Sequence, residues 1–179
     1  MQSRSMLSFD VYLVGSTLAL IAIGILFIYS TGVTSTGRVV SNEYIRQIVW
    51  ASTGIILLFA TALLPHGTAR QWAIPFYLGV IVLLLVTLAF GRVVNGARSW
   101  LGIGGLGIQP SEFAKLASIL MLAHFFDRIG SGVQRIPMLA AGFLIVALPM
   151  TLTLMQPDLG TALVFIPIFL VLLFVAGAR

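Results

Sequence analysis

Apolar runs of about 20 residues, separated by short polar or glycine-rich breaks, make up most of this chain. An α-helix rises 1.5 Å per residue, so about 20 apolar residues cross roughly 30 Å of hydrocarbon. Such runs cover residues 11–31, 45–64, 73–91, 110–126, 136–155 and 158–176. The pattern predicts an all-α fold, a polytopic transmembrane helix bundle of about six spans, within a single integral membrane domain over residues 1–179.

The longest polar break, residues 92–109, lies between the third and fourth runs. It contains five glycines, which make it a poor helix: Gly96, Gly102, Gly104, Gly105 and Gly107. We expect an ordered loop at the membrane interface. Its GxGGxG pattern lacks the strand and βαβ setting of a nucleotide site.

A Gln-Pro-acid phrase precedes two of the runs, as Gln109-Pro110-Ser111-Glu112 and as Gln156-Pro157-Asp158. Proline is favoured at the first position of a helix, and an acid in the first turn complements the positive end of the helix dipole. Both phrases therefore predict helix starts with the acid in the first turn. The two acids are separated by about two membrane crossings, so we expect them to face the same compartment.

Composition supports a membrane protein, because 59% of the residues are hydrophobic and only 8% are charged. The ten basic and five acidic residues are scattered, which argues against a nucleic-acid partner. The absence of cysteine excludes disulfides, thiol catalysis and Cys-based metal sites. The run 11–31 is longer than a signal-peptide core and no cleavage site stands out, so we interpret it as a retained span.

Orientation follows from the arginines in the short loops. With a cytoplasmic N-terminus, the inner side carries Arg4, Arg70, Arg128, Arg135 and Arg179, and the outer side carries Arg38, Arg46, Arg92 and Arg98. This small bias favours a cytoplasmic N-terminus, which places residues 92–109 and both Gln-Pro-acid phrases outside. The outer arginines fit either an anionic ligand or ordinary interfacial snorkelling.

Glu112 and Lys115 stand three residues apart and are expected to pair on one helix face. Lys115 is the only lysine, and it lies about 7–8 Å of helix rise beyond Pro110. A charge at the centre of a membrane helix costs about 2.5–3.5 kcal/mol, so it normally faces a partner or a polar cavity. The alternative is that Lys115 snorkels outward and Glu112 only stabilises the helix dipole.

Three other side chains are candidates for a polar cavity or for more ordinary roles. Asp158 has no evident partner in the sequence, and it either shapes a cavity with Glu112 and Lys115 or stabilises a helix dipole. Arg98 suits a phosphate, and Trp100 suits the membrane interface, a sugar or an isoprenoid chain. His124, on the face opposite Lys115, is predicted to be a hydrogen-bonded or interfacial histidine.

Three blocks of sequence together resemble the SEDS family (shape, elongation, division and sporulation). They are Asn95-Gly96-Ala97-Arg98-Ser99-Trp100-Leu101, residues 109–117 and residues 156–163. The first block is similar to the elongation branch, which controls cell shape, more than to the division branch. Within the family pattern, Glu112, Lys115 and Asp158 match positions that line a cavity implicated in activity.

The resemblance implies a bacterial plasma-membrane protein of about ten spans that polymerises lipid II and releases undecaprenyl pyrophosphate. It also implies a class B penicillin-binding protein as transpeptidase partner. The family's catalytic aspartate, in a loop after the seventh span, is expected beyond Arg179. We therefore expect this chain to be an N-terminal portion that contains no catalytic residue and does not polymerise by itself.

The favoured function is a membrane glycosyltransferase. In this hypothesis Arg98 and Lys115 supply positive charge to phosphate, Glu112 orients Lys115, and Asp158 shapes the cavity. No cofactor is evident, and a divalent cation held in part by Asp158 is left open. The alternatives are a lipid II flippase or transporter, a division protein of the same family, and a noncatalytic scaffold for cell-wall enzymes.

Overall fold

The computed structural model describes residues 10–33, 42–94, 96–103 and 106–178. Several residues of the sequence analysis lie outside these ranges: Arg4, Arg38, Asn95, Gly104, Gly105 and Arg179. The chain forms two compact units, Met1–Pro65 and His66–Arg179, and each is described by itself.

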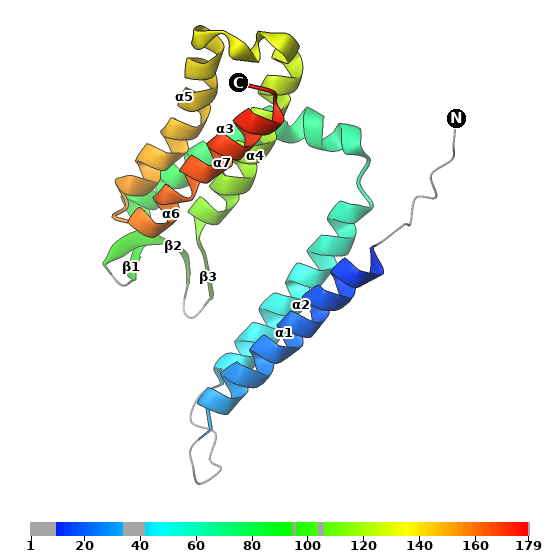
Figure 1. The fold of residues 1–179 in the computed structure, drawn as a ribbon. Coiled ribbons are helices and arrows are strands. Elements are labelled where there is room, and N and C mark those ends of the chain that lie inside the picture. The colour runs from blue at the N-terminus through cyan, green and yellow to red at the C-terminus, as the bar shows by residue number, and fades with distance from the viewer. Residues whose placement is uncertain (1–9, 34–41, 95, 104–105, 179) are drawn as a thin grey trace. The chain divides into compact units, whose positions relative to one another are not determined.

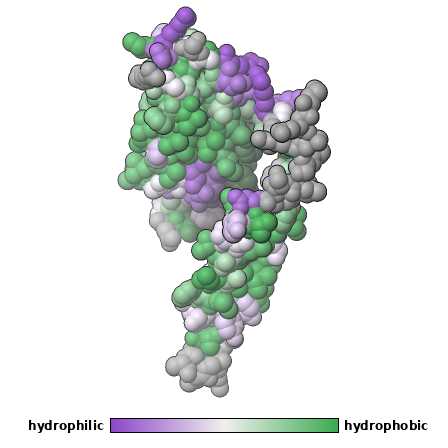
Figure 2. Space-filling model, turned by 45° about the vertical axis from the view of Figure 1, so that its right-hand side comes forward, coloured by the Kyte–Doolittle hydropathy of each residue, from purple (hydrophilic) through white to green (hydrophobic). Residues whose placement is uncertain are grey.

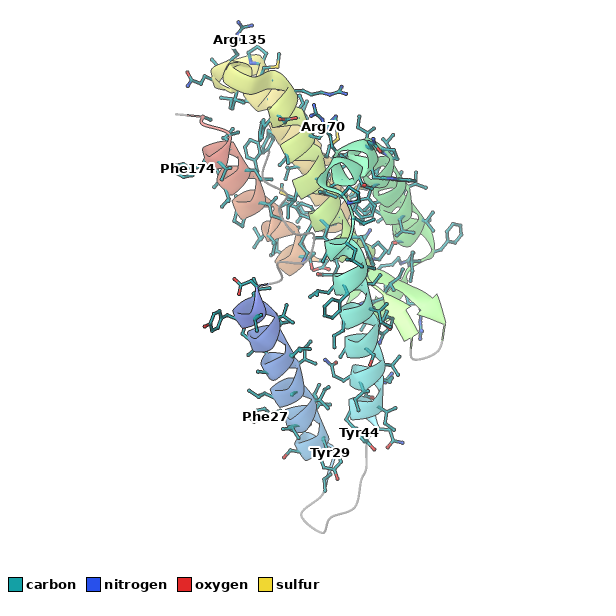
Figure 3. All side chains as sticks on the ribbon, turned by 90° about the vertical axis from the view of Figure 1, so that its right-hand side faces the viewer. Phe27, Tyr29, Tyr44, Arg70, Arg135 and Phe174 are labelled. Atoms are coloured by element: carbon teal, nitrogen blue, oxygen red, sulfur yellow. The ribbon has the colours of Figure 1, made fainter. Side chains whose placement is uncertain are left out.

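The first unit is a helical hairpin of α1 (Val11–Thr31) and α2 (Glu43–Ala62) (Figure 1). Asp10 caps α1, and its Oδ1 atom accepts hydrogen bonds from the amides of Tyr12 and Leu13 at 3.0 and 3.2 Å. At the other end of the hairpin the rings of Tyr29 and Tyr44 meet edge to face, with centroids 5.2 Å apart (Figure 3).

The second unit contains the other helices and a small sheet. Its helices are α3 (His66–Phe90), α4 (Pro110–Ile129), α5 (Ile136–Leu154), α6 (Leu159–Leu163) and α7 (Phe165–Val175), with a 3-10 helix at Gly130–Gln134. The sheet consists of β1 (Arg92–Val94), β2 (Ala97–Ile103) and β3 (Leu106–Ile108). All three strands are antiparallel, in the order β1-β2-β3.

Small side chains on α4 form much of its contact with the rest of the second unit. Ser111, Ala114, Ala117 and Ser118 are all buried on this helix. Short side chains let helix backbones approach closely, which drives helix association in membranes. Across the bundle, the Tyr77 hydroxyl of α3 donates a hydrogen bond to the Ile145 carbonyl of α5 at 2.7 Å.

Among the described residues, four helices are long and apolar enough to cross a membrane: α1, α2, most of α3 (Gly67–Phe90) and α5. Helix α4 has 20 residues but carries four charged side chains, and α6 with α7 forms a shorter apolar stretch, Leu159–Val175. Hydrophobic residues cover most of the helical surface visible in Figure 2. The protein is therefore a polytopic helical membrane protein.

The largest departures of the helices from the expected ranges are at three places. Helix α3 begins at His66 instead of residue 73, and α4 continues to Ile129 instead of residue 126. The last apolar run is broken at Val164. Pro167 has no N–H to donate to the carbonyl of Leu163, so one continuous helix from 158 to 176 would leave that carbonyl unpaired.

The expected loop at 92–109 is a sheet instead. Val93 and Val94 favour extended backbone, and Gly96, with φ of +85°, supplies the left-handed residue that the turn between β1 and β2 needs. The sheet lies at the end of the second unit where α4 and α6 begin (Figure 1). Both Gln-Pro-acid phrases therefore belong to one end of this unit.

Candidate functional site

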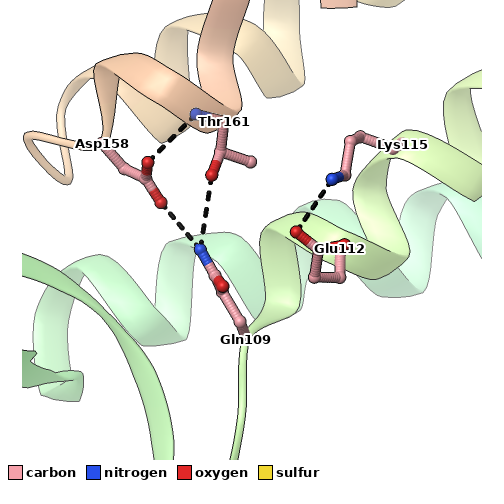
Figure 4. A network of polar contacts seen from close by, with 5 residues as sticks. All are labelled: Gln109, Glu112, Lys115, Asp158 and Thr161. Atoms are coloured by element: carbon pink, nitrogen blue, oxygen red, sulfur yellow. Dashed lines mark hydrogen bonds and ion pairs between the residues drawn. The ribbon is translucent and has the colours of Figure 1, made fainter. Parts of the chain in front are cut away.

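The two Gln-Pro-acid phrases are joined by a hydrogen bond. The Gln109 Nε2 atom donates to Asp158 Oδ2 at 2.7 Å and makes a longer contact of 3.4 Å with Thr161 Oγ1 (Figure 4). The other carboxylate oxygen, Oδ1, accepts a hydrogen bond from the Thr161 amide at 3.1 Å. We call this set of contacts among Gln109, Asp158 and Thr161 the Gln109–Asp158 bridge.

Two expectations about Asp158 are wrong. It was predicted in the first helical turn, but it is the N-cap residue of α6, because Pro157 precedes the cap instead of opening the helix. It was also predicted to have no evident partner, whereas Gln109 is its partner from 49 residues away. The first phrase does open its helix at Pro110, and Glu112 lies in the first turn of α4.

Glu112 and Lys115 form the ion pair that their spacing predicts. The Lys115 Nζ atom donates to Glu112 Oε1 at 2.8 Å (Figure 4). The side chain of Glu112 is 55% exposed, whereas that of Lys115 is only 22% exposed. The Lys115 side chain is thus the less exposed of the two.

Gln156, the first residue of the second phrase, is completely buried. Its side-chain amide donates to the Leu84 carbonyl of α3 at 3.0 Å, and its main-chain carbonyl accepts a hydrogen bond from the Arg98 amide of β2 at 3.1 Å. One residue thus connects α3, the sheet and the turn that carries Asp158. The Gln156 Oε1 atom has no hydrogen-bond partner within the described residues.

Arg98 and Trp100 flank Ser99 on β2, and Ser99 is buried. The pairing of β1 with β2 shifts here, because Arg92 lies opposite Trp100 whereas Val93 lies opposite Arg98. The Arg98 side chain is exposed and makes one long contact, 3.5 Å, to the Ala89 carbonyl. A Cβ atom at Gly107 would lie 3.3 Å from the Trp100 ring, so the glycine lets the indole pack against β3.

The described contacts do not join all five predicted site residues. Asp158 belongs to the Gln109–Asp158 bridge, and Glu112 pairs with Lys115, but no side-chain hydrogen bond or ion pair among the described residues connects the two groups. Arg98 is connected to the turn before Asp158 through its main chain alone. The cavity role of these residues therefore stays a prediction.

Sequence analysis missed both glutamines as residues that organise the site. The sequence did carry a signal, because Gln is the first residue of each copy of the repeated phrase. His124 was predicted to be a hydrogen-bonded or an interfacial histidine. The first alternative is wrong within the described part of the chain, since both ring nitrogens are buried without a partner, and the second stays a prediction. The hydroxyls of Ser111 and Ser118 on the same helix are also unpaired there.

The described residues contain no group of three or more His, Cys, Asp and Glu side chains that could hold a metal ion. Asp158 uses one oxygen for the amide of its own helix and the other for Gln109. A divalent cation at Asp158 stays a prediction.

The chain matches a known family over nearly its whole length. The sequence model of the family described as "Cell cycle protein", for FtsW, RodA and SpoVE, matches residues 11–179. This chain belongs to that FtsW/RodA/SpoVE family, which is the SEDS family that its sequence blocks resemble.

Individual relatives are similar over almost all of this chain. Peptidoglycan glycosyltransferase RodA of Treponema pallidum is 49% identical over 99% of this chain and 41% of its own length. Stage V sporulation protein E of Bacillus subtilis is 36% identical over 95% of this chain and 48% of its own length.

Solved structures share the fold. The crystal structure of the rod shape determining protein RodA of Thermus thermophilus has a TM-score of 0.80 at 31% identity, over 97% of this chain and 55% of that one. A structure described as the coordination of polymerization and crosslinking by a peptidoglycan synthase complex has a TM-score of 0.82 at 34% identity, over 96% and 48%. The chain spans about half the length of the relatives it matches.

Proposed function

We propose that this protein takes part in peptidoglycan glycosyl transfer, as a lipid II polymerase of cell elongation and cell-shape control. The observation that carries the proposal is the 49% identity, over 99% of the chain, to a protein named peptidoglycan glycosyltransferase RodA. A polar end on an otherwise apolar helical unit suits a substrate with a polar head and a hydrocarbon tail, because such a lipid contacts both regions.

The reaction joins two lipid-linked sugars. A hydroxyl oxygen of the acceptor sugar attacks the anomeric carbon of the donor, and the bond from that carbon to the pyrophosphate oxygen breaks. The pyrophosphate leaves with the bonding electrons as undecaprenyl pyrophosphate, and a general base takes the hydroxyl proton. In this proposal the residues of this chain supply binding and electrostatics.

Lys115 is the proposed partner of the leaving pyrophosphate. Its side chain is only 22% exposed, and its ammonium donates to Glu112 at 2.8 Å, which restricts its position. A preorganised cation in a poorly solvated place stabilises developing negative charge better than a mobile cation in water. Arg98, whose side chain is exposed, is the proposed second contact to phosphate, since guanidinium binds phosphate oxygens in pairs.

The remaining expectations belong to the same proposal. The protein acts in the bacterial plasma membrane with a cytoplasmic N-terminus and a class B penicillin-binding protein as transpeptidase partner. Support for a partner comes from the solved relative, which is described as part of a peptidoglycan synthase complex.

Within the second unit, Arg70 pairs with Asp127 at 3.2 Å, and this pair joins the beginning of α3 to the end of α4.

The test uses the whole encoded protein, purified in detergent and supplied with lipid II, with glycan length measured by gel electrophoresis. Replacement Lys115→Gln should lower the polymerisation rate on the order of 10²-fold, the effect of losing one charge-stabilising group. Arg70→Gln, which also removes one positive charge but lies at the other end of α3, is the matched control and should leave the rate unchanged.

Other outcomes would favour other functions. Translocation of lipid II in vesicles without polymer would support a flippase and overturn the polymerase proposal. Unchanged polymerisation by Lys115→Gln would remove Lys115 from the mechanism. Loss of partner capture with normal turnover would instead indicate a scaffold role for the Glu112–Lys115 pair.

A further inference from the structure

We infer that Gln109 is a positioning residue, and that Asp158 acts through Gln109 instead of touching the substrate. The inference rests on the proposed function and specifies how the polar end of the second unit is assembled. In this view the Gln109–Asp158 bridge holds the first turn of α4, with its Glu112–Lys115 pair, at a set position against α6.

Among the described contacts, the side chain of Gln109 bonds to residues at the start of α6 and not to the helix that it caps. Gln109 is the N-cap residue of α4, and an N-cap side chain normally bonds to an amide of its own helix. Within the described part of the chain Gln109 makes no such bond, and its amide instead reaches Asp158 and Thr161 at the start of α6. The contact therefore serves the connection between two helices more than the start of one.

The carboxylate of Asp158 is occupied on both oxygens. Oδ1 accepts from the Thr161 amide at 3.1 Å, and Oδ2 accepts from Gln109 at 2.7 Å, a short distance typical of a hydrogen bond to a charged acceptor. A carboxylate held in this way is oriented by the protein on both sides. This arrangement fits a structural connection better than a group aimed at a ligand.

The bridge has a direct consequence for the charged pair. Gln109 immediately follows the last residue of β3, and Lys115 lies less than two helical turns after it on α4. A change at Gln109 therefore shifts the sheet and the Glu112–Lys115 pair together. Misplacement of a reacting group by about 1 Å can cost on the order of 10²-fold in rate.

Two substitutions can exchange the hydrogen-bond donor and acceptor of the bridge while keeping its shape. Replacement Gln109→Glu places two carboxylates against each other, and adding Asp158→Asn restores a donor and an acceptor with exchanged positions. The asparagine oxygen can still accept the hydrogen bond from the Thr161 amide, so the cap of α6 is retained. The double variant thus keeps the bridge while it removes the negative charge from position 158.

The experiment measures kcat and KM for glycan polymerisation from lipid II by the whole encoded protein, with thermal unfolding in detergent measured in parallel. We expect Gln109→Glu to lower kcat by about 10- to 100-fold, and the double variant to recover to within about threefold of the wild type. Gln134→Glu, an exposed residue of the 3-10 helix, is the matched charge control and should have no effect.

Each outcome decides the inference. If the double variant is stable but as inactive as Gln109→Glu alone, the carboxylate of Asp158 is itself required, and the inference is wrong. If Gln109→Glu does not fold, Gln109→Met replaces it as the broken bridge, and normal kcat in that variant also overturns the inference. A wild type that makes no polymer overturns the proposed function, and the inference falls with it.

Discussion

Replacement Gln156→Met tests whether a fully buried polar side chain stabilises this fold. Methionine is unbranched and similar in volume, so the change removes the two polar atoms with little change in packing. The main-chain hydrogen bond from Arg98 to the Gln156 carbonyl is retained, since it does not involve the side chain.

The two polar side-chain atoms of Gln156 have opposite effects on the free energy of unfolding. Loss of the hydrogen bond to Leu84 costs about 0.5–1.5 kcal/mol, and the Leu84 carbonyl keeps its partner because it lies inside α3. Removal of the unpaired, buried Oε1 atom recovers about 1–3 kcal/mol. The difference between relief and loss runs from about −0.5 to +2.5 kcal/mol, so Gln156→Met should leave the free energy of unfolding nearly unchanged or raise it by up to about 2.5 kcal/mol.

The assay is reversible unfolding in mixed micelles, followed by tryptophan fluorescence, with Gln134→Met as the exposed control. The control should change the free energy of unfolding by less than about 0.5 kcal/mol. If Gln156→Met lowers the free energy of unfolding by more than about 1.5 kcal/mol, the Oε1 atom must have a partner, and the reasoning fails. Gln156→Glu, which buries a charge at the same place, should lower stability strongly.

Two further changes test the packing of the second unit by the same unfolding measurement. Tyr77→Phe removes the hydrogen bond to Ile145 and should lower the free energy of unfolding by about 0.6–1.7 kcal/mol, the range for such bonds in membranes. An unchanged free energy of unfolding would show that the bond contributes nothing. Gly142→Ala brings a Cβ atom to 3.1 Å from the Phe126 ring and should cost about 1–3 kcal/mol. Gly79→Ala, with open space at its Cβ, should instead stabilise α3 by about 0.5–1 kcal/mol, and equal effects at the two glycines would contradict the packing.

Features that depend on neighbouring residues were predictable from the sequence. Hydrophobic runs located the helices, and Gln109-Pro110 marked the start of α4. The Glu112–Lys115 pair followed from helical spacing alone. The break at Val164 also has a local cause, Pro167. It was not predicted, because the apolar run is continuous there and many membrane helices tolerate proline.

The sheet at 92–108 was only half predictable. Its glycines correctly argued against a helix, but they did not indicate that the segment would pair into three strands. Strand pairing requires a register between partners, for example Leu101 with Ile108, and this register was not apparent from a glycine-rich sequence that lacks clear alternation.

By itself, the sequence determined that this is a helical membrane protein of the FtsW/RodA/SpoVE family, and it determined where charge enters the fourth helix. Only the tertiary structure decided that Gln109 holds Asp158, 49 residues away, and that Gln156 holds Leu84, 72 residues away. The physical reason is that hydrophobicity and helical spacing act locally along the chain. Contacts between distant polar groups exist only once the helices have packed and set their relative positions.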